Sequence, residues 1–175
     1  MLAGDSAGGG LALGLAQDLL ADGAPLPERL VLLSPWLDLT LSNPAIPEYE
    51  RRDPWLAKAG LVEAGLVWAG GDDPTAPRLS PRNGALTGLP RVALFVGTRE
   101  IAYPDVADLG RSAAEAGVEV DLTVAEGAVH VYPLVPAPEG TEGARGVVAA
   151  VAGGLPVVTA GGATPGSRRR RGLWR

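Results

Sequence analysis

The sequence predicts an α/β fold built on a parallel sheet of about three to four strands with flanking helices. Short apolar runs at 30–33 and 91–96 are typical of strands that are buried on both faces of a sheet. Helical stretches alternate with these runs, which indicates parallel strands joined by right-handed crossovers. The length of 175 residues and the 46% share of hydrophobic residues suit one domain with a sizeable core.

The first half of the chain sets up this alternation. Asp22 and Gly23 are a stop signal for the leucine-rich stretch before them, and Trp68 lies on the apolar stripe of the second helical stretch, which predicts a core position. In order, we expect a strand remnant at 1–3, a helix at 6–21, a strand at 30–33, an irregular segment at 41–54 and a helix at 55–70.

The second half continues the pattern. Pro104 suits the first turn of a helix and Gly117 suits the position just past its end. Alternating apolar residues in the last strand favour a sheet edge exposed on one face. We expect an irregular connection at 72–90, a strand at 91–96, a helix at 104–116, a strand at 118–125 and a helix at 140–153. The folded domain is therefore assigned to 1–153, and 154–175 is expected to be a disordered Arg-rich tail.

Charge is distributed unevenly along the chain. All twenty acidic residues lie at or before Glu142, whereas five of the fifteen basic residues are Arg168 to Arg171 and Arg175. Residues 1–167 therefore carry ten basic and twenty acidic side chains, which argues against a nucleic-acid surface there. The arginine run, which has no accompanying aromatic or helical pattern, is interpreted as a solvated tail.

The residue counts also exclude several classes of site. The chain has no cysteine and one histidine, which excludes disulfides, thiol nucleophiles and metal sites built from cysteines or several histidines. No run of eighteen apolar residues offers a membrane span, and no basic segment precedes an apolar core as in a secretory signal. The sequence therefore predicts a cytoplasmic protein with no bound metal and no membrane span.

Three loops at the carboxyl ends of the predicted strands carry candidate catalytic residues. Residues 4–8, GDSAG, fit the pattern G-x-S-x-G between a strand and a helix, the setting that places Ser6 on a sharp turn. Glu100 follows the strand at 91–96, and His130 follows the strand at 118–125. A serine hydroxyl needs an imidazole to accept its proton, and a carboxylate to fix the imidazole tautomer. The order serine, acid, histidine favours a catalytic triad, although GDSAG alone fits a structural turn equally well.

The helix that begins at the serine adds a further catalytic element. Backbone N–H groups at a helix N-terminus point toward negative charge that develops beside them. The N–H of Ala7, directly after Ser6, is therefore the expected oxyanion-hole donor.

Four stretches carry a family resemblance: GDSAGGGLALGLA, LLSPWLDLT, GLPRVALFVGTREI and EGAVHVYPL. Together they resemble the hormone-sensitive-lipase-like family of α/β hydrolases, the fold-3 esterases, over residues 1 to 150. The resemblance implies cofactor-free hydrolysis of a small carboxylic ester, of short-acyl or lactone type. By motif, Ser6 matches the nucleophile and His130 the base. Glu100 stands where the family usually has Asp, and Asp105 is the alternative acid.

The chain also departs from the family pattern. Members have a longer N-terminal half with the first strands, a cap and a His-Gly-Gly motif that completes the oxyanion hole. The resemblance is therefore to the C-terminal part only and predicts a partial α/β-hydrolase fold whose N-terminal half is missing. An unpaired central strand would then form a sheet edge that favours self-association and low solubility.

Several alternatives stay open at this point. The chain could be a catalytically inactive truncated hydrolase fragment, a half that depends on a partner chain, or an acyltransferase that uses the same triad. Val131 and Tyr132 replace the family's Gly-Phe and are expected to affect pocket shape. Trp36 suits either an acyl pocket or a packing role, and Asp38 and Asp53 are interpreted as turn or cap residues.

Overall fold

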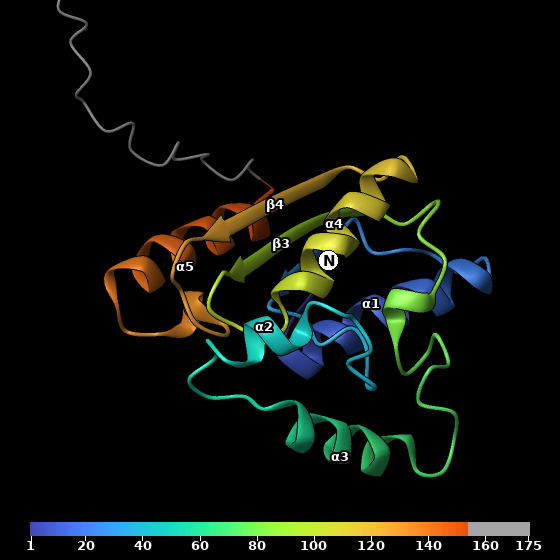
Figure 1. Cartoon of the computed structure of the whole chain (residues 1–175). Helices are drawn as coiled ribbons and strands as arrows, with labels where there is room; N and C mark the ends of the chain where they lie inside the picture. The colour runs from blue at the N-terminus through green and yellow to red at the C-terminus, as the bar shows by residue number, and fades with distance from the viewer. Residues whose placement is uncertain (154–175) are drawn as a thin grey trace, which may run out of the picture.

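The computed structural model describes residues 1–153 and shows one parallel sheet with helices on both faces (Figure 1). The tail predicted at 154–175 lies outside the described residues. The strands pair in chain order, β1-β2-β3-β4, and every pair is parallel. Their bounds are β1 (Leu2–Asp5), β2 (Arg29–Leu33), β3 (Arg91–Gly97) and β4 (Val120–Ala125). The predicted α/β class with a parallel sheet is confirmed.

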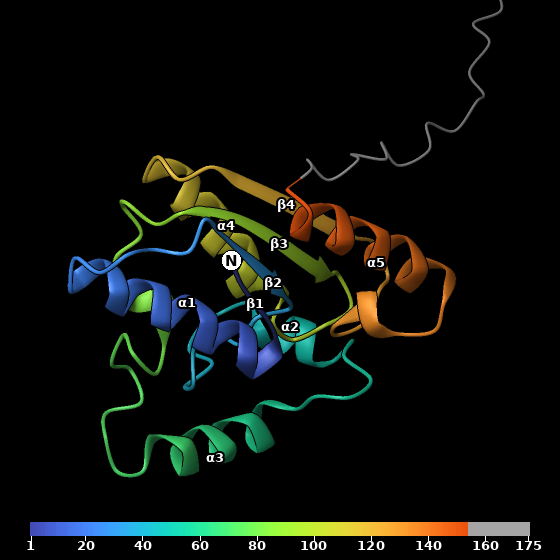
Figure 2. The same cartoon turned by 180° about the vertical axis from the view of Figure 1, so that it is seen from behind.

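Helices connect these strands and cover the sheet. The α-helices are α1 (Ser6–Ala21), α2 (Ile46–Glu50), α3 (Lys58–Ala69), α4 (Tyr103–Glu115) and α5 (Pro138–Val151), and the short 3₁₀-helices are η1 (Pro81–Asn83) and η2 (Tyr132–Leu134). Residues of α1 and α4 pack on one face of the sheet, and residues of α5 pack on the other. The two views show α4 and α5 on opposite sides of β3 and β4 (Figures 1 and 2).

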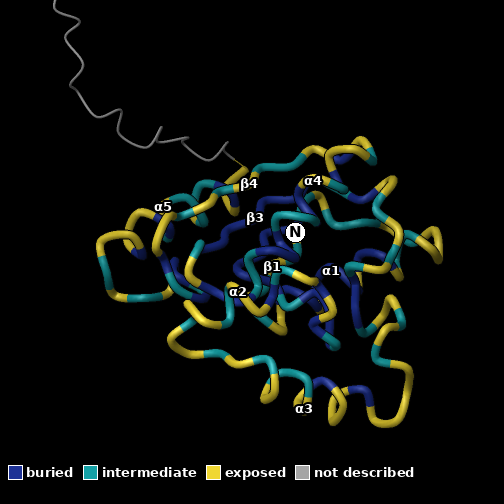
Figure 3. The backbone as a smooth tube through the Cα atoms, viewed as in Figure 1, coloured by how far each residue is buried: buried dark blue, intermediate teal, exposed yellow. Residues whose placement is uncertain are grey.

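The two central strands supply both sides of the core. In β2, Leu30 and Leu32 face the α1/α4 side, whereas Val31 and Leu33 face the α5 side, because successive side chains of a strand point to opposite faces. Burying each large apolar side chain stabilises the fold by about 1.5–3 kcal/mol. In Figure 3 the backbone of β3, in the middle of the molecule, is coloured dark blue as buried. The prediction that these apolar runs are buried on both faces is therefore confirmed.

The segment 41–54 is more regular than the sequence suggested. It contains α2, a single short helix with Pro47 in its first turn. A proline is tolerated there because the N–H groups of the first turn have no intrahelical partner. The prediction of an irregular segment was wrong at these positions, since proline was counted as a breaker where it begins a helix.

Helix α3 shows a second difference. Trp68, predicted in the core, is 64% exposed, and Leu66 and Val67 are exposed as well. Only Gly65 and Ala69 of this helix are buried. The helix lies apart from the sheet and is mostly exposed (Figures 1 and 3). The core prediction for Trp68 was wrong because the apolar residues of α3 surround the helix, so their spacing does not select one inner face.

The two edge strands of the sheet are β4 and β1. β4 forms one edge with Leu122 39% and Val124 42% exposed, which confirms the predicted half-exposed edge strand. β1 forms the other edge, beside the GDSAG loop, with Ala3 and Asp5 exposed. Self-association through that edge stays a prediction.

None of the helices within residues 1–153 has the length and apolar character needed to cross a membrane.

Candidate active site

Ser6 lies on a sharp turn between β1 and α1. Its backbone φ is +48°, a region that non-glycine residues rarely occupy, and it is the first residue of the helix. The turn is tight because a Cβ at Gly4 would lie 2.2 Å from the carbonyl oxygen of Gly8. The Ser6 carbonyl accepts a hydrogen bond of 2.8 Å from the Trp36 amide, which ties the turn to the loop after β2. This is the strained strand-to-helix turn that G-x-S-x-G predicts.

The structure brings Ser6, His130 and Glu100 into one hydrogen-bonded chain. His130 Nε2 lies 2.9 Å from Ser6 Oγ, and His130 Nδ1 lies 2.6 Å from Glu100 Oε2. The glutamate is fully buried and the histidine is 6% exposed. Since a carboxylate only accepts hydrogen bonds, the neutral imidazole satisfies both neighbours with its proton on Nδ1 and its lone pair on Nε2 facing the serine hydroxyl.

The second oxygen of the Glu100 carboxylate is also occupied. Oε1 accepts hydrogen bonds of 2.7 Å from the Ser34 hydroxyl and 2.7 Å from the Gly97 amide. A buried carboxylate is costly unless such donors compensate for its lost water. The loop that carries His130 packs directly on this end of β3, since a Cβ at Gly97 would lie 2.1 Å from the Ala128 carbonyl oxygen.

Sequence reasoning missed Ser34. The residue directly follows β2 and stands within the family stretch LLSPWLDLT, where the motif by itself assigns it no role. The available signal was its position, because functional loops of a parallel sheet lie at the carboxyl ends of the strands.

Asp105, the alternative acid, occupies a different place. It is 5% exposed on α4, and its Oδ1 accepts hydrogen bonds from Asn43 Nδ2 at 2.9 Å and Arg82 Nη1 at 2.9 Å. Burial raises the pKa of Asp105, against the lowering effects of Asn43 and Arg82. Within the described residues, the carboxylate beside the His130 imidazole is Glu100, and Asp105 instead joins α4 to two other segments.

The other two aspartates organise loops around the site. Asp38 accepts backbone hydrogen bonds from Thr40 at 2.8 Å and Ser42 at 3.0 Å. Burial alone would raise the pKa of Asp38, but these residues' hydrogen bonds outweigh it and lower the pKa to about 2. Asp53 Oδ2 accepts the Ile101 amide at 2.8 Å, next to Glu100. Both behave as the turn and cap residues that the sequence predicted.

A mainly apolar pocket opens beside Ser6 and His130. It encloses about 320 Å³ including its open mouth. Its lining residues are Ser6, Pro35, Trp36, Leu37, Leu41, Leu56, Leu61, Ile101, Ala102, Asp105 and His130. Trp36 lines the pocket and packs against the buried cluster of Leu41, Ile46 and Ile101, and its indole N–H donates to the Asp38 carbonyl at 2.9 Å. The packing role is therefore confirmed, and contact with an acyl group stays a prediction.

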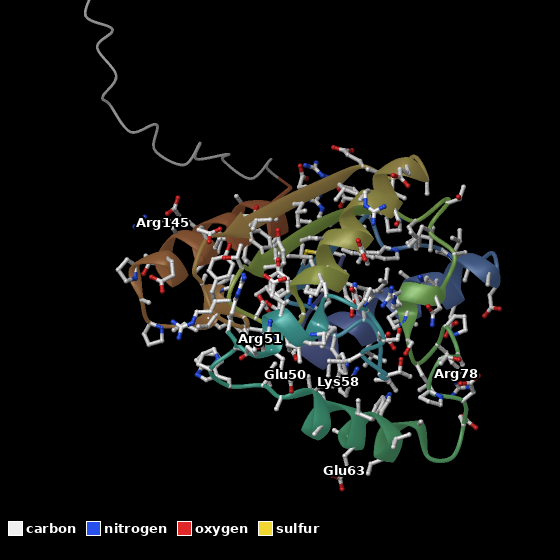
Figure 4. All side chains as sticks on the ribbon, in the orientation of Figure 1. Glu50, Arg51, Lys58, Glu63, Arg78 and Arg145 are labelled. Carbon is white, nitrogen blue, oxygen red and sulfur yellow. The ribbon has the colours of Figure 1, made fainter. Side chains whose placement is uncertain are left out.

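Lys58 contacts Leu41, one of the residues that line the pocket. Lys58 Nζ donates to the Leu41 carbonyl at 2.8 Å, and the Lys58 amide donates to Glu50 Oε1 at 2.8 Å. The side chains of Glu50 and Lys58 appear between α2 and α3 in the stick view (Figure 4). This contact joins the start of α3 to the wall of the pocket.

The expected oxyanion donor lies in the first turn of α1. The N–H groups of such a turn have no intrahelical partner. Ala7 is exposed, and no acidic side chain occupies this first turn. Ala7 thus lies directly after Ser6 at the exposed start of the helix, and its role as oxyanion-hole donor stays a prediction. Within residues 1–153, no three acidic or histidine side chains are placed to hold a metal ion.

Comparisons with known proteins show which family this chain resembles. A sequence profile described as "alpha/beta hydrolase fold" matches residues 1–134. An acetyl-hydrolase of Streptomyces hygroscopicus is 37% identical over 139 residues, which cover 77% of this chain and 46% of that protein. An esterase of Acinetobacter venetianus is 35% identical over 129 residues, which cover 73% of this chain and 42% of that protein.

Solved structures are similar as well. The crystal structure of an esterase from the bacterial hormone-sensitive lipase family has a TM-score of 0.74 at 35% identity. The match covers 82% of this chain and 49% of that one. The chain thus spans just under half the length of these relatives, and it carries part of their fold.

Proposed function

The chain belongs to the alpha/beta hydrolase fold family, and on that premise we propose that it hydrolyses carboxylic esters through an acyl-enzyme formed on Ser6. The observation that carries the proposal is the continuous hydrogen-bonded chain from Ser6 Oγ through His130 to Glu100. Such a chain makes a serine hydroxyl nucleophilic at neutral pH, because the imidazole accepts its proton during attack.

In the acylation step, Ser6 Oγ attacks the ester carbonyl carbon while His130 Nε2 takes the hydroxyl proton. The resulting imidazolium donates from Nδ1 to Glu100, whose negative charge stabilises it. The carbonyl oxygen becomes an oxyanion beside the N-terminus of α1, where the Ala7 amide donates to it. When the tetrahedral intermediate collapses, His130 returns the proton to the departing alcohol and the acyl group stays on Ser6.

Deacylation repeats these steps with water. His130 accepts a proton from a water molecule as its oxygen attacks the acyl carbon, and then gives the proton back to Ser6 Oγ as the carboxylic acid leaves. These steps use the side chains of the proposed triad and the Ala7 backbone amide, so the proposal requires no cofactor.

A short acyl group is the proposed substrate class. The pocket beside Ser6 is small, and Pro35, Leu37 and Ile101 give it apolar walls that suit an acetyl to butyryl chain. One relative is named an acetyl-hydrolase, which agrees with this size.

Hydrolysis of p-nitrophenyl acetate, butyrate and octanoate by the purified full chain tests the proposal. We expect release of p-nitrophenol above the uncatalysed rate, with the two short esters preferred over octanoate because the pocket volume is at the small end of the range for ligand pockets. Release no faster than in protein-free buffer for all three esters would reject ester hydrolysis by this chain.

The acid assignment has its own prediction. Glu100→Gln keeps the size of the side chain and removes the charge that stabilises the imidazolium, so kcat should fall by about 10⁴-fold. Asp105→Asn is the matched control, because Asp105 is also buried and lines the same pocket without a hydrogen bond to the imidazole. Steady-state kinetics of the two variants should separate them. A larger loss of kcat in Asp105→Asn than in Glu100→Gln would transfer the role of acid to Asp105.

A further inference from the structure

We propose that Ser34 is a positioning residue of this site, whose hydroxyl fixes the Glu100 carboxylate and the loop of His130 relative to each other. The inference rests on the function proposed above. It concerns a residue in a third loop, after β2, and not one of the three members of the hydrogen-bonded triad.

The hydroxyl of Ser34 joins two loops that are far apart in the sequence. Its Oγ lies 2.7 Å from Glu100 Oε1 and 3.0 Å from the backbone nitrogen of Val131, the residue after His130. The roles in these bonds are fixed by chemistry. The Val131 amide only donates and a carboxylate only accepts, so the single Ser34 proton has to point at Glu100.

The backbone around this contact is unusual on both sides. Ser34 has a φ of +44° and Val131 has a φ of +47°, and β-branched residues are especially rare in that region. The Ser34 amide donates to the Phe95 carbonyl at 2.7 Å, which extends the β2–β3 ladder by one residue and anchors the turn. Residues held in such sparsely populated conformations indicate that the surroundings determine them strongly.

The consequence for the triad follows from the carboxylate. With Oε1 held by Ser34 and Gly97, the other oxygen, Oε2, is aimed at His130 Nδ1. Loss of the hydroxyl leaves one donor on Oε1 in a fully buried site, which lets the carboxylate turn so that Oε2 is no longer aimed at His130 Nδ1. A carboxylate that has turned away stabilises the protonated imidazole less, so the His130 titration should move to lower pH.

Other titratable groups lie around Glu100 and His130, and the test has to leave them unchanged. Tyr132 follows on η2, and its pKa is raised to about 12 by burial and by the charges of Glu142 and Glu100. Asp105 on α4 lines the same pocket. A change confined to Ser34 leaves all of these residues in place, so a shift of the His130 titration reports the lost hydroxyl.

The experiment uses the fact that His130 is the one histidine in the chain. Its ¹⁵N NMR titration therefore reads a single residue, without assignment. Ser34→Gly removes the hydroxyl while tolerating a positive φ, and Ser34→Ala is the second variant. We expect both variants to lower the titration midpoint and to slow labelling of Ser6 by a fluorophosphonate by about 10-fold or more, as for a lost hydrogen bond to a charged group.

Ser80→Ala is the matched control. Ser80 is also fully buried, and its hydroxyl accepts from the Leu39 amide at 2.8 Å and donates to the Pro74 carbonyl at 2.6 Å. It should lower stability without moving the His130 titration. In a Glu100→Gln background, Ser34→Gly should add little to the loss of labelling, because both changes act on one hydrogen bond.

Each outcome decides between the claims. A folded Ser34→Gly or Ser34→Ala with an unchanged His130 titration and unchanged labelling overturns the role of Ser34. An equal titration shift in Ser80→Ala also overturns it, since the effect would then be general loosening. Absence of Ser6 labelling in the wild-type chain rejects the proposed function, and this role with it, whatever the titration shows.

Discussion

Replacing Ser6 with alanine should lower kcat for p-nitrophenyl acetate by about 10⁶-fold, the scale on which serine hydrolases lose activity without their nucleophile. The reason is that Ser6 Oγ is the atom that attacks, and the structure places it 2.9 Å from the only imidazole. KM should change little, because the apolar lining of the pocket is left in place. Steady-state hydrolysis of the purified variant and the wild-type chain measures the effect.

Two further variants make this result interpretable. Ser6→Gly tests the same loss without a Cβ at φ +48°, so a defect shared by both variants comes from the hydroxyl and not from backbone strain. Ser112→Ala, a serine change on the distant part of α4, should keep the wild-type rate. A Ser6→Ala protein that retains more than a small fraction of the wild-type kcat would exclude Ser6 as the nucleophile.

Replacing His130 should cost kcat on the same scale, about 10⁶-fold, since the imidazole both accepts and returns the proton in each step. His130→Ala also removes the hydrogen-bond partner of a fully buried carboxylate, so the free energy of unfolding should fall as well. Thermal unfolding monitored by circular dichroism, together with kinetics, separates the catalytic loss from the loss of fold.

Chemical rescue distinguishes a base from a packing residue. Imidazole added to His130→Ala should restore part of the activity, because the missing side chain leaves a space next to Ser6 and Glu100. His130→Gln, which fills that space with a side chain that cannot carry the proton, should stay inactive and show weaker rescue. Near-wild-type kcat in either variant would contradict the role of general base.

The strands were predictable because their chemistry is local. The run at 30–33 is apolar at every position, which in a parallel sheet means burial on both faces, and the structure confirms this for Leu30 to Leu33. Pro104 and Gly117 likewise bracket α4 closely. The burial of residues whose position depends on tertiary packing was less predictable. Trp68 is exposed because α3 stands apart from the sheet, and no pattern within the helix states where the helix lies.

The candidate site was predictable at the level of loops and not at the level of contacts. Ser6, Glu100 and His130 were chosen because each follows a predicted strand, and carboxyl ends of parallel strands share one edge of the sheet. The choice between Glu100 and Asp105 needed distances, because the two acids are five positions apart on the chain. Ser34 was missed because serine after a strand is common, and its partners come from two other loops.

Labelling of the wild-type chain by a fluorophosphonate, read by mass spectrometry of the intact protein and its peptides, tests the central claim most directly. We predict one adduct, on Ser6, that forms far more slowly in His130→Ala. No adduct, or an adduct elsewhere whose rate does not depend on His130, would contradict a working nucleophile in this chain and favour an inactive or partner-dependent chain.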